Sequence, residues 1–282
     1  MVTIVREARE MSSLLTQRRR RGQTIGLVPT MGYLHEGHLS LVRSSRMEND
    51  VSVVSLFVNP LQFGPGEDLS RYPRNEARDR ELLDGEGVDF LFAPAAETLY
   101  APDHSTFVDE AALSLPLCGA SRPGHFRGVC TVVLKLFNIV GPDRAYFGMK
   151  DYQQLQVIRR MVRDLSVPVT IRGCPLVREP DGLALSSRNT YLSPQERTSA
   201  LALSSALEAT ARAYADGERS VPALLEGLRG RLTRDPLLQI DYAEIRDAES
   251  LEALDVVEAP AVVALAVRVG KTRLIDNAVI GG

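Results

Sequence analysis

Short apolar runs alternate with stretches of helical periodicity over about the first 175 residues. The apolar runs predict strands at Thr24–Val28, Val51–Val58, Val88–Phe92, Arg144–Phe147 and Val167–Ile171. The periodic stretches predict helices at His38–Glu48, Arg74–Glu86, Val129–Ile139 and Asp151–Leu165. Because strand–helix alternation builds right-handed βαβ units, we predict an α/β, Rossmann-like parallel sheet with helices on both faces.

The remainder of the chain has a different pattern. Ser193-Pro194-Gln195-Glu196 is a capping box with proline at the first helical position, and it predicts a helix that runs to about Gly217. A second helix is predicted from Ser220 to about Asp235-Pro236. Strands are then predicted at Gln239–Ile245, Ala261–Val269 and Thr272–Ile275. We therefore expect a first domain at 1–175 and a smaller α+β domain at 176–282, with the boundary between Gly173 and Ser193.

The composition is that of a soluble globular protein, with 44% hydrophobic and 24% charged residues in 282. A formal net charge of −3 argues against a general nucleic-acid or membrane-surface binder. The cysteines Cys118, Cys130 and Cys174 are widely spaced, which is typical of buried thiols in a reducing compartment. The sequence shows no signal-peptide core and no apolar run that could span a bilayer, so we expect a cytoplasmic protein.

Two histidines lie three residues apart directly after the first strong strand, in Met31-Gly32-Tyr33-Leu34-His35-Glu36-Gly37-His38. A turn that opens a helix directs free N–H groups and the positive end of the helix dipole toward the ligand region above a sheet. Imidazoles there can donate hydrogen bonds to phosphate. The alternative is a pair of loop histidines without a task. Zinc is disfavoured, because the metalloprotease spacing is His-Glu-x-x-His.

A lysine stands at another predicted strand–helix junction, in Phe147-Gly148-Met149-Lys150-Asp151. Lys150 could contact phosphates as a point charge, or it could be an exposed lysine beside a helix-capping Asp151. Farther along, Leu185-Ser186-Ser187-Arg188 combines two hydroxyls with a guanidinium, a set that suits anions but also occurs in plain turns.

The loop at 59–68 contains Gly64-Pro65-Gly66 and follows a strong strand. It could be a surface connection or a lid over a reacting intermediate. The basic run Arg18–Arg21 lies at the end of a predicted helix, where cations favour the dipole, and we interpret it as a solvated face.

Together and in this order, these elements resemble the adenylate-forming nucleotidyltransferase superfamily. Longer segments resemble one family within it, the pantoate–β-alanine ligases (pantothenate synthetases), and they extend in colinear order over nearly the whole chain. These segments are Val28–Leu41, Phe57–Phe63, Arg122–Val129, Lys150–Gln154 and Gly182–Asn189.

The resemblance implies condensation of pantoate with β-alanine, using ATP and magnesium, through an enzyme-bound pantoyl adenylate. It implies a homodimer with small-molecule substrates and without nucleic-acid or membrane partners. It also implies catalytic roles for His35, His38, Lys150 and Arg188. ATP would bind to Met31, Gly32, Tyr33, Leu34, His35, Glu36, Gly37, His38, Gly148, Met149, Lys150, Asp151, Val177, Leu185, Ser186, Ser187 and Arg188.

Pantoate would bind Gln62 and Gln154, with Gln62 also near β-alanine, and supporting residues would be Asn59, Tyr72, Arg122 and His125. The chain departs from the usual pattern at Leu185, where methionine is commoner, and at Met149, where a polar or acidic residue is commoner. The first exchange nearly conserves volume.

Three other functions remain to be separated from this one. An aminoacyl-tRNA synthetase or a cytidylyltransferase could use the same paired histidines, and a nucleotide sensor could keep the pocket without turnover. The first would need an anticodon-reading region and a basic surface, and this short, acidic chain shows neither.

Overall fold

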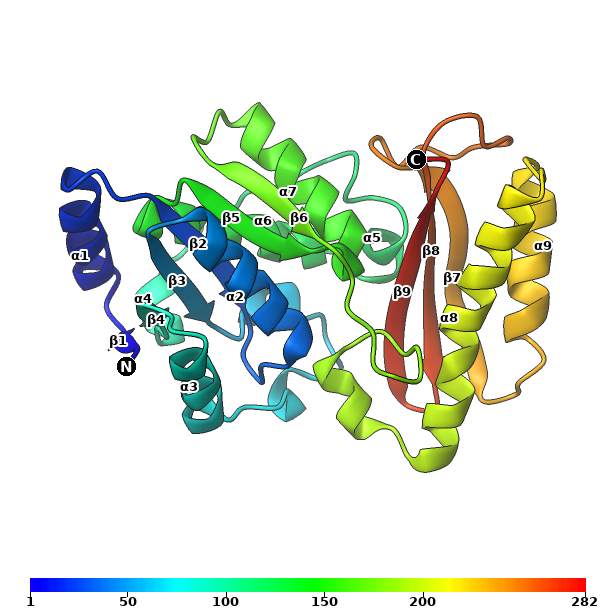
Figure 1. Cartoon of the computed structure of the whole chain (residues 1–282), viewed down its shortest axis with the longest axis horizontal. Coiled ribbons are helices and arrows are strands. Elements are labelled where there is room, and N and C mark those ends of the chain that lie inside the picture. The colour runs from blue at the N-terminus through cyan, green and yellow to red at the C-terminus, as the bar shows by residue number, and fades with distance from the viewer. The chain divides into compact units, whose positions relative to one another are not determined.

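The computed structural model describes residues 1–282, which form two compact units (Figure 1). The first unit comprises residues 1–114, 122–149 and 154–175, and the second comprises 115–121, 150–153 and 176–282. Two short segments that the sequence pattern placed in the first domain, 115–121 and 150–153, thus belong to the second unit. One of them contains Lys150.

The first unit is built on a six-stranded parallel sheet with the order β1-β4-β3-β2-β5-β6. Its strands are β1 Thr3–Val5, β2 Ile25–Thr30, β3 Val51–Leu56, β4 Phe90–Phe92, β5 Arg144–Gly148 and β6 Thr170–Cys174. From β2 the chain moves outward to β3 and β4, whereas from β5 it moves the other way to β6. The strand order therefore reverses between β2 and β5, where parallel sheets bind ligands beyond their carboxyl ends.

Helices cover both faces of this sheet. They are α1 Ala8–Arg20, α2 Glu36–Glu48, α3 Glu76–Gly85, α4 Ala96–Leu99, α6 His125–Val140 and α7 Tyr152–Asp164. α2 lies across β2, β3 and β5 (Figure 1) and shares a buried core with Tyr146 of β5. The next residue, Phe147, points to the opposite face and meets Phe137 of α6 at 6.5 Å between ring centroids. α1 packs beside α6.

The second unit has a three-stranded antiparallel sheet in the order β7-β8-β9. Its elements are α5 Cys118–Ser121, α8 Pro194–Ala215, α9 Val221–Leu232, β7 Leu238–Asp247, β8 Ala261–Val269 and β9 Thr272–Ile280. α8 and α9 lie side by side against the sheet and bury leucines such as Leu203 and Leu228 (Figure 1). The Ser193 hydroxyl accepts from the Glu196 N–H, and the Glu196 carboxylate accepts from the Ser193 N–H, which confirms the predicted capping box.

The predicted fold class is confirmed, with differences at individual elements. The strand predicted at Val167–Ile171 begins only at Thr170, because Ser166 takes a left-handed turn (φ 51°) and Pro168 cannot donate to a ladder. β9 extends to Ile280 rather than Ile275, and β1 was not predicted. None of the helices combines the length and the apolar character needed to cross a bilayer.

Candidate active site

The turn after β2 has a conformation that its sequence requires. Gly32 has φ +83° and Tyr33 has φ 51°, and a Cβ on Gly32 would lie 3.1 Å from both the Asp79 carboxylate and the Leu56 side chain. Residue 32 must therefore be glycine or strained. The N–H groups of Tyr33 and Leu34 donate to the two oxygens of Asp79 at 2.8 and 2.7 Å.

Asp79 is a site-building residue that the sequence interpretation missed. Its side chain is 1% exposed, and burial raises the pKa of its carboxyl although the two backbone donors lower it. Arg78 next to it donates to the Leu34 carbonyl at 2.9 Å. A signal was present in the sequence, because Asp79 occupies the apolar face of α3, four residues before the buried Leu83.

The paired histidines stand at the start of α2. His35 is the N-cap, and its backbone N–H donates to Nδ1 of His38 at 3.3 Å. A nitrogen that accepts carries no proton, so the neutral His38 ring bears its hydrogen on Nε2. The two rings lie 4.0 Å apart between centroids. The helix therefore begins with a fixed imidazole N–H donor beside its own dipole.

Hydrogen bonds of Asn59 hold the start of the loop after β3 in place. Asn59 is 1% exposed, and its amide donates to Gln62 Oε1 and to the Gly128 carbonyl, both at 3.1 Å. The Tyr100 hydroxyl donates to the Asn59 oxygen at 2.8 Å. The Gln62 amide in turn donates to the sulfur of Met31 at 3.2 Å, so Gln62 lies against the turn after β2.

Residues 122–125, which lead into α6, hold the same loop from the other direction. Arg122 donates to the Gln62 carbonyl at 3.2 Å and forms an ion pair with Glu67 at 2.6 Å. Nδ1 of His125 donates to the same Gln62 carbonyl at 2.9 Å, and Nε2 accepts from Arg122 at 3.1 Å. Burial raises the pKa of the Glu67 carboxyl, but the hydrogen bond and charge of Arg122, followed by the Gly64 backbone and His125, together leave that pKa lowered. The predicted supporting residues Asn59, Arg122 and His125 thus all hold the backbone or side chain of Gln62.

Two further residues predicted for the site, Tyr72 and Gln154, lie in the first unit. Tyr72 is buried and packs edge-on against Phe63 at 6.0 Å between ring centroids. Gln154 is half-buried in the first turn of α7, which begins four residues past the end of β5.

Lys150 belongs to the second unit, in the 3₁₀ turn Met149–Asp151 that links β5 to α7. Its backbone carbonyl accepts from the Asn277 amide of β9 at 2.9 Å. Its ammonium lies 3.7 Å from the Asp151 carboxylate, and its side chain is 22% exposed.

The Ser-Ser-Arg loop also belongs to the second unit. Arg178 and Ala184 form a β-bridge, and the Leu185 N–H donates to the Val177 carbonyl at 3.0 Å. These bonds bring the predicted residues Val177 and Leu185 side by side. Ser186 then caps a 3₁₀ helix, Ser187–Tyr191, by accepting from the Arg188 N–H at 3.3 Å.

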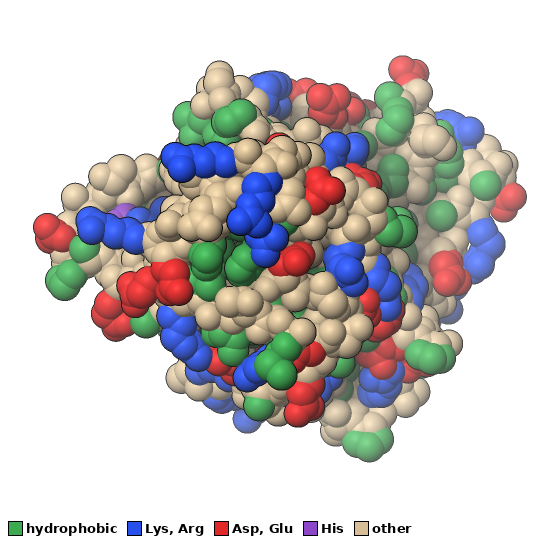
Figure 2. Space-filling view, turned by 60° about the vertical axis from the view of Figure 1, so that its left-hand side comes forward, with side chains coloured by type: hydrophobic (Ala, Val, Ile, Leu, Met, Phe, Trp, Pro, Cys, Tyr) green, Lys and Arg blue, Asp and Glu red, His purple; other side chains and the backbone are tan.

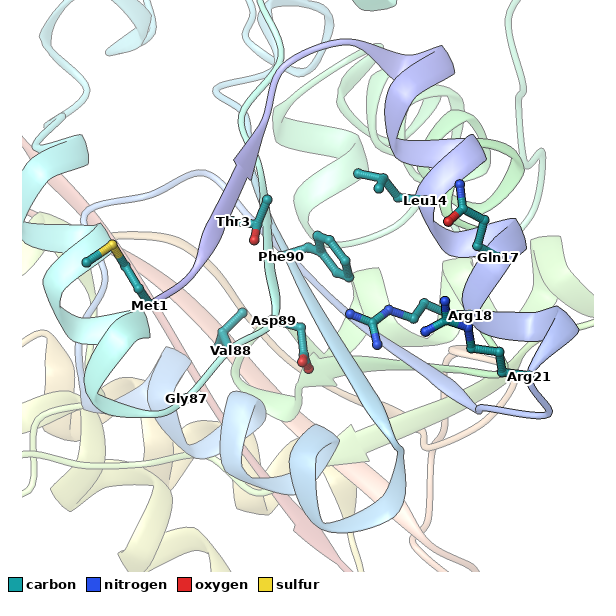
Figure 3. Close-up of a pocket in the computed structure, with 10 residues that line it drawn as sticks. All are labelled: Met1, Thr3, Leu14, Gln17, Arg18, Arg21, Gly87, Val88, Asp89 and Phe90. Carbon is teal, nitrogen blue, oxygen red and sulfur yellow. The ribbon is translucent and has the colours of Figure 1, made fainter.

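A pocket of about 540 Å³ lies at the opposite, amino-terminal ends of β1 and β4 (Figure 3). It is lined by Thr3 and Phe90, by the side chains of Arg18 and Arg21 from the end of α1, and by none of the predicted site residues. The Arg18 guanidinium lies 5.7 Å from the centre of the Phe90 ring. On the face shown in Figure 2, basic and acidic side chains are interspersed.

A family model for pantoate-beta-alanine ligase matches residues 3–279. The chain is 57% identical to the pantothenate synthetase of Thermotoga neapolitana over 278 residues, which cover 99% of each chain. It is 54% identical to that of Geobacter sulfurreducens, with 99% of this chain and 98% of the relative covered.

Solved structures with the same names also superpose on this chain. Pantothenate synthetase from Thermus thermophilus superposes with a TM-score of 0.93 at 50% identity, covering 99% of both chains. The pantoate-beta-alanine ligase of Francisella tularensis, solved in complex with β-γ ATP and β-alanine, superposes with a TM-score of 0.81 at 33% identity, covering 99% of this chain and 97% of that one.

Proposed function

The chain belongs to the pantoate–β-alanine ligase family, and we propose that it activates the pantoate carboxylate with ATP before β-alanine attacks. The enzyme condenses pantoate with β-alanine in an ATP-dependent reaction that forms a carbon–nitrogen bond. The proposal concerns the path of this reaction, a pantoyl adenylate that releases pyrophosphate and then AMP, and the residues that support each step.

The proposal rests on two sequences that follow neighbouring strands at the point where the strand order reverses. Met31–His38 follows β2, and Gly148–Asp151 begins at the last residue of β5. Anionic ligands of parallel sheets bind in this region because loops and helix N-termini present N–H donors there. His38 offers an oriented Nε2 hydrogen at the start of α2.

We propose ATP-binding residues in each unit. In the first unit these are Met31, Gly32, Tyr33, Leu34, His35, Glu36, Gly37, His38, Gly148 and Met149. In the second unit they are Lys150, Asp151, Val177, Leu185, Ser186, Ser187 and Arg188. Support comes from the family resemblance and from the local geometry of each segment.

Pantoate would bind the amides of Gln62 and Gln154, which can pair with its hydroxyls and carboxylate. Gln62 suits this role because Arg122 and His125 fix its backbone while Asn59 and Met31 contact its side-chain amide. An oriented amide lowers the entropy that substrate binding must overcome. Tyr72 would support the loop through Phe63.

The first chemical step brings one anion to another, a carboxylate to the α-phosphorus of ATP. Catalysis then depends on charge neutralisation and in-line positioning rather than on a protein nucleophile. Lys150, Arg188 and the Nε2 hydrogen of His38 would offset charge on the triphosphate and on departing pyrophosphate. The amine of β-alanine would then attack the mixed anhydride and release AMP. A closed 59–68 loop would exclude water from that anhydride.

We further propose that magnesium accompanies ATP and that the enzyme is a homodimer, both on the family resemblance. We propose a cytoplasmic location on the three widely spaced, buried cysteines. No group of three or more His, Cys, Asp or Glu side chains in the chain is arranged to hold a metal ion. Magnesium suits phosphate oxygens and water as ligands, and there it would reduce the negative charge of the triphosphate.

The test is exchange of labelled pyrophosphate into ATP by the purified chain. We expect exchange that requires pantoate and proceeds without β-alanine, and pantothenate when β-alanine is added. His38→Ala and Lys150→Ala should each slow exchange about 100- to 1,000-fold, the typical effect of removing one preorganised donor. The controls are His38→Gln, which keeps a side-chain N–H, and Lys271→Ala, which removes an exposed lysine from a different loop.

The outcomes separate the alternative functions. An aminoacyl-tRNA synthetase would need an amino acid for exchange, a cytidylyltransferase would need CTP, and a sensor would show no exchange. Exchange near the wild-type rate in Lys150→Ala or His38→Ala would refute the roles assigned to these residues.

A further inference from the structure

Two consecutive polar residues are buried in the middle of β9. Asp276 is 3% exposed and Asn277 is 9% exposed. Burying such groups costs free energy unless each finds hydrogen-bond partners. Because successive side chains of a strand point to opposite sides, the pair reaches two different segments of the second unit.

Asn277 reaches the segment that follows β5. Its side-chain amide donates to the backbone carbonyl of Lys150 at 2.9 Å. This bond fixes the backbone from which the Lys150 side chain extends, while that side chain itself stays 22% exposed.

Asp276 reaches the base of the Ser-Ser-Arg loop. Its two oxygens accept from the two terminal nitrogens of Arg178 at 2.7 and 3.0 Å, a bidentate pair. Arg178 also donates to the Gly182 carbonyl at 3.0 Å, so the same guanidinium spans the turn of the loop. The Asp276 side chain is 2% exposed and that of Arg178 is 31% exposed, so the carboxylate end of the pair is shielded from water.

Asp276 and Asn277 also contact each other, and Arg178 is linked through the backbone to the proposed phosphate-binding residues. The Asn277 N–H donates to Asp276 Oδ1 at 2.8 Å. Arg178 forms a β-bridge with Ala184, and Ser186, Ser187 and Arg188 follow within four residues of that bridge. A displacement of Arg178 would therefore pass to the loop through a short stretch of backbone.

We infer that Asp276 and Asn277 are positioning residues that hold Lys150 and the Ser186–Arg188 loop in register with one another from a single strand. The inference rests on the proposed ATP site. Misplacing a charge-neutralising group by about 1 Å can cost on the order of 100-fold in rate. The pair therefore acts on ATP activation through its neighbours, without touching substrate.

The experiment measures the two half-reactions separately in the full-length enzyme. Pyrophosphate exchange reports ATP activation, and β-alanine attack on supplied pantoyl adenylate reports the second step. In Asn277→Ala we expect kcat/KM for ATP in exchange to fall about 10- to 100-fold. Attack on supplied adenylate should stay within about threefold of wild type, because it does not need the Lys150 charge on the β- and γ-phosphates.

The matched control is Thr272→Val. It removes the hydroxyl of another buried polar residue of β9 and keeps the shape of the side chain. It should leave both half-reactions within about twofold, since the substitution leaves the hydrogen bonds of Lys150 and Arg178 in place. If Asn277→Ala does not fold, Asp276→Asn decides, because it keeps the shape and removes the charge that pairs with Arg178. It should lower exchange at least about tenfold.

If the wild-type enzyme shows pantoate-dependent exchange, and Asn277→Ala or Asp276→Asn exchanges at the same rate, this inference is wrong. The proposed function would then still stand. Equal losses in both half-reactions of Asn277→Ala, matched by Thr272→Val, would also overturn it, because that pattern is general destabilisation. Absence of pantoate-dependent exchange in the wild-type enzyme would instead overturn the proposed function and the inference with it.

Discussion

Arg122 and Glu67 form an ion pair that connects the 59–68 loop to the segment before α6. The side chains are 16% and 24% exposed, and Arg122 also donates to the carbonyl of Gln62. Two guanidinium nitrogens donate to the two carboxylate oxygens, and a half-buried ion pair with this bidentate geometry stabilises more than a typical surface pair. The loop that presents Gln62 therefore depends on the ionised state of one carboxyl group.

The stability of this contact should depend on pH with a definite sign. Arg122 lowers the folded-state pKa of Glu67 below its usual value of 4.5. The contribution is therefore present above about pH 4.5 and is lost as pH falls through the lower, folded-state pKa. Glu67→Gln should lower the free energy of unfolding by about 1–2 kcal/mol at pH 7, and by progressively less as the pH falls below the usual glutamate pKa.

Urea unfolding of wild type and variant from neutral to acidic pH measures this difference. Glu81→Gln, at an exposed glutamate of α3, is the control and should follow wild type throughout. A difference between wild type and Glu67→Gln that grew as pH fell would contradict the lowered pKa of Glu67.

At the level of elements, α6 and the 3₁₀ turn Pro60–Gln62 are in backbone contact. A Cβ on Gly128 would lie 2.3 Å from the Leu61 carbonyl oxygen, so the helix carries glycine where the turn approaches it. The Asn59 amide donates to the carbonyl of the same glycine. The position of Gln62 thus depends on one missing methyl group.

Gly128→Ala should therefore harm the enzyme although alanine favours helices. We expect it to raise KM for pantoate at least about tenfold and to destabilise the fold by about 1–3 kcal/mol, the usual cost of overpacking. The matched control is Gly227→Ala in α9, where a Cβ would meet nothing within 4 Å. That change should stabilise by about 0.5–1 kcal/mol with unchanged kinetics. Steady-state kinetics and urea unfolding check both, and a stabilised, fully active Gly128→Ala would contradict this packing.

The pattern of apolar residues was sufficient to predict the bounds of strands that are buried along almost their whole length. Ala261–Val269 was predicted with its observed bounds because the strand is apolar almost throughout. β9 was predicted only to Ile275, since Asp276 and Asn277 interrupt the apolar pattern. They remain in the strand because Arg178 and Lys150 satisfy them, and those partners lie 98 and 127 residues away in sequence.

Partners that lie far apart in sequence also limit how much of the candidate site can be predicted. Local sequence was enough to propose the His35–His38 turn, Lys150 and Ser186–Arg188 as site residues, because turns and helix starts are local features. Asp79 was missed because its partners, Tyr33 and Leu34, are 45 or 46 residues away. A buried acid on an apolar helix face marks such a residue, but only the structure identifies its partners.

For the molecule as a whole, family membership fixes the overall reaction, while the path through an adenylate is the central proposal. In the proposed path, the pantoate carboxylate has to reach the α-phosphorus of ATP, and pyrophosphate leaves. An alternative path, through an acyl phosphate, would place the attack on the γ-phosphorus and release ADP. The two paths send the carboxylate oxygen to different products.

The most direct measurement follows ¹⁸O from the pantoate carboxylate during turnover with ATP and β-alanine. We predict one ¹⁸O atom in AMP for each pantothenate formed, detected by mass spectrometry, and unlabelled pyrophosphate. Label in inorganic phosphate with formation of ADP, or AMP without label, would contradict activation at the α-phosphorus.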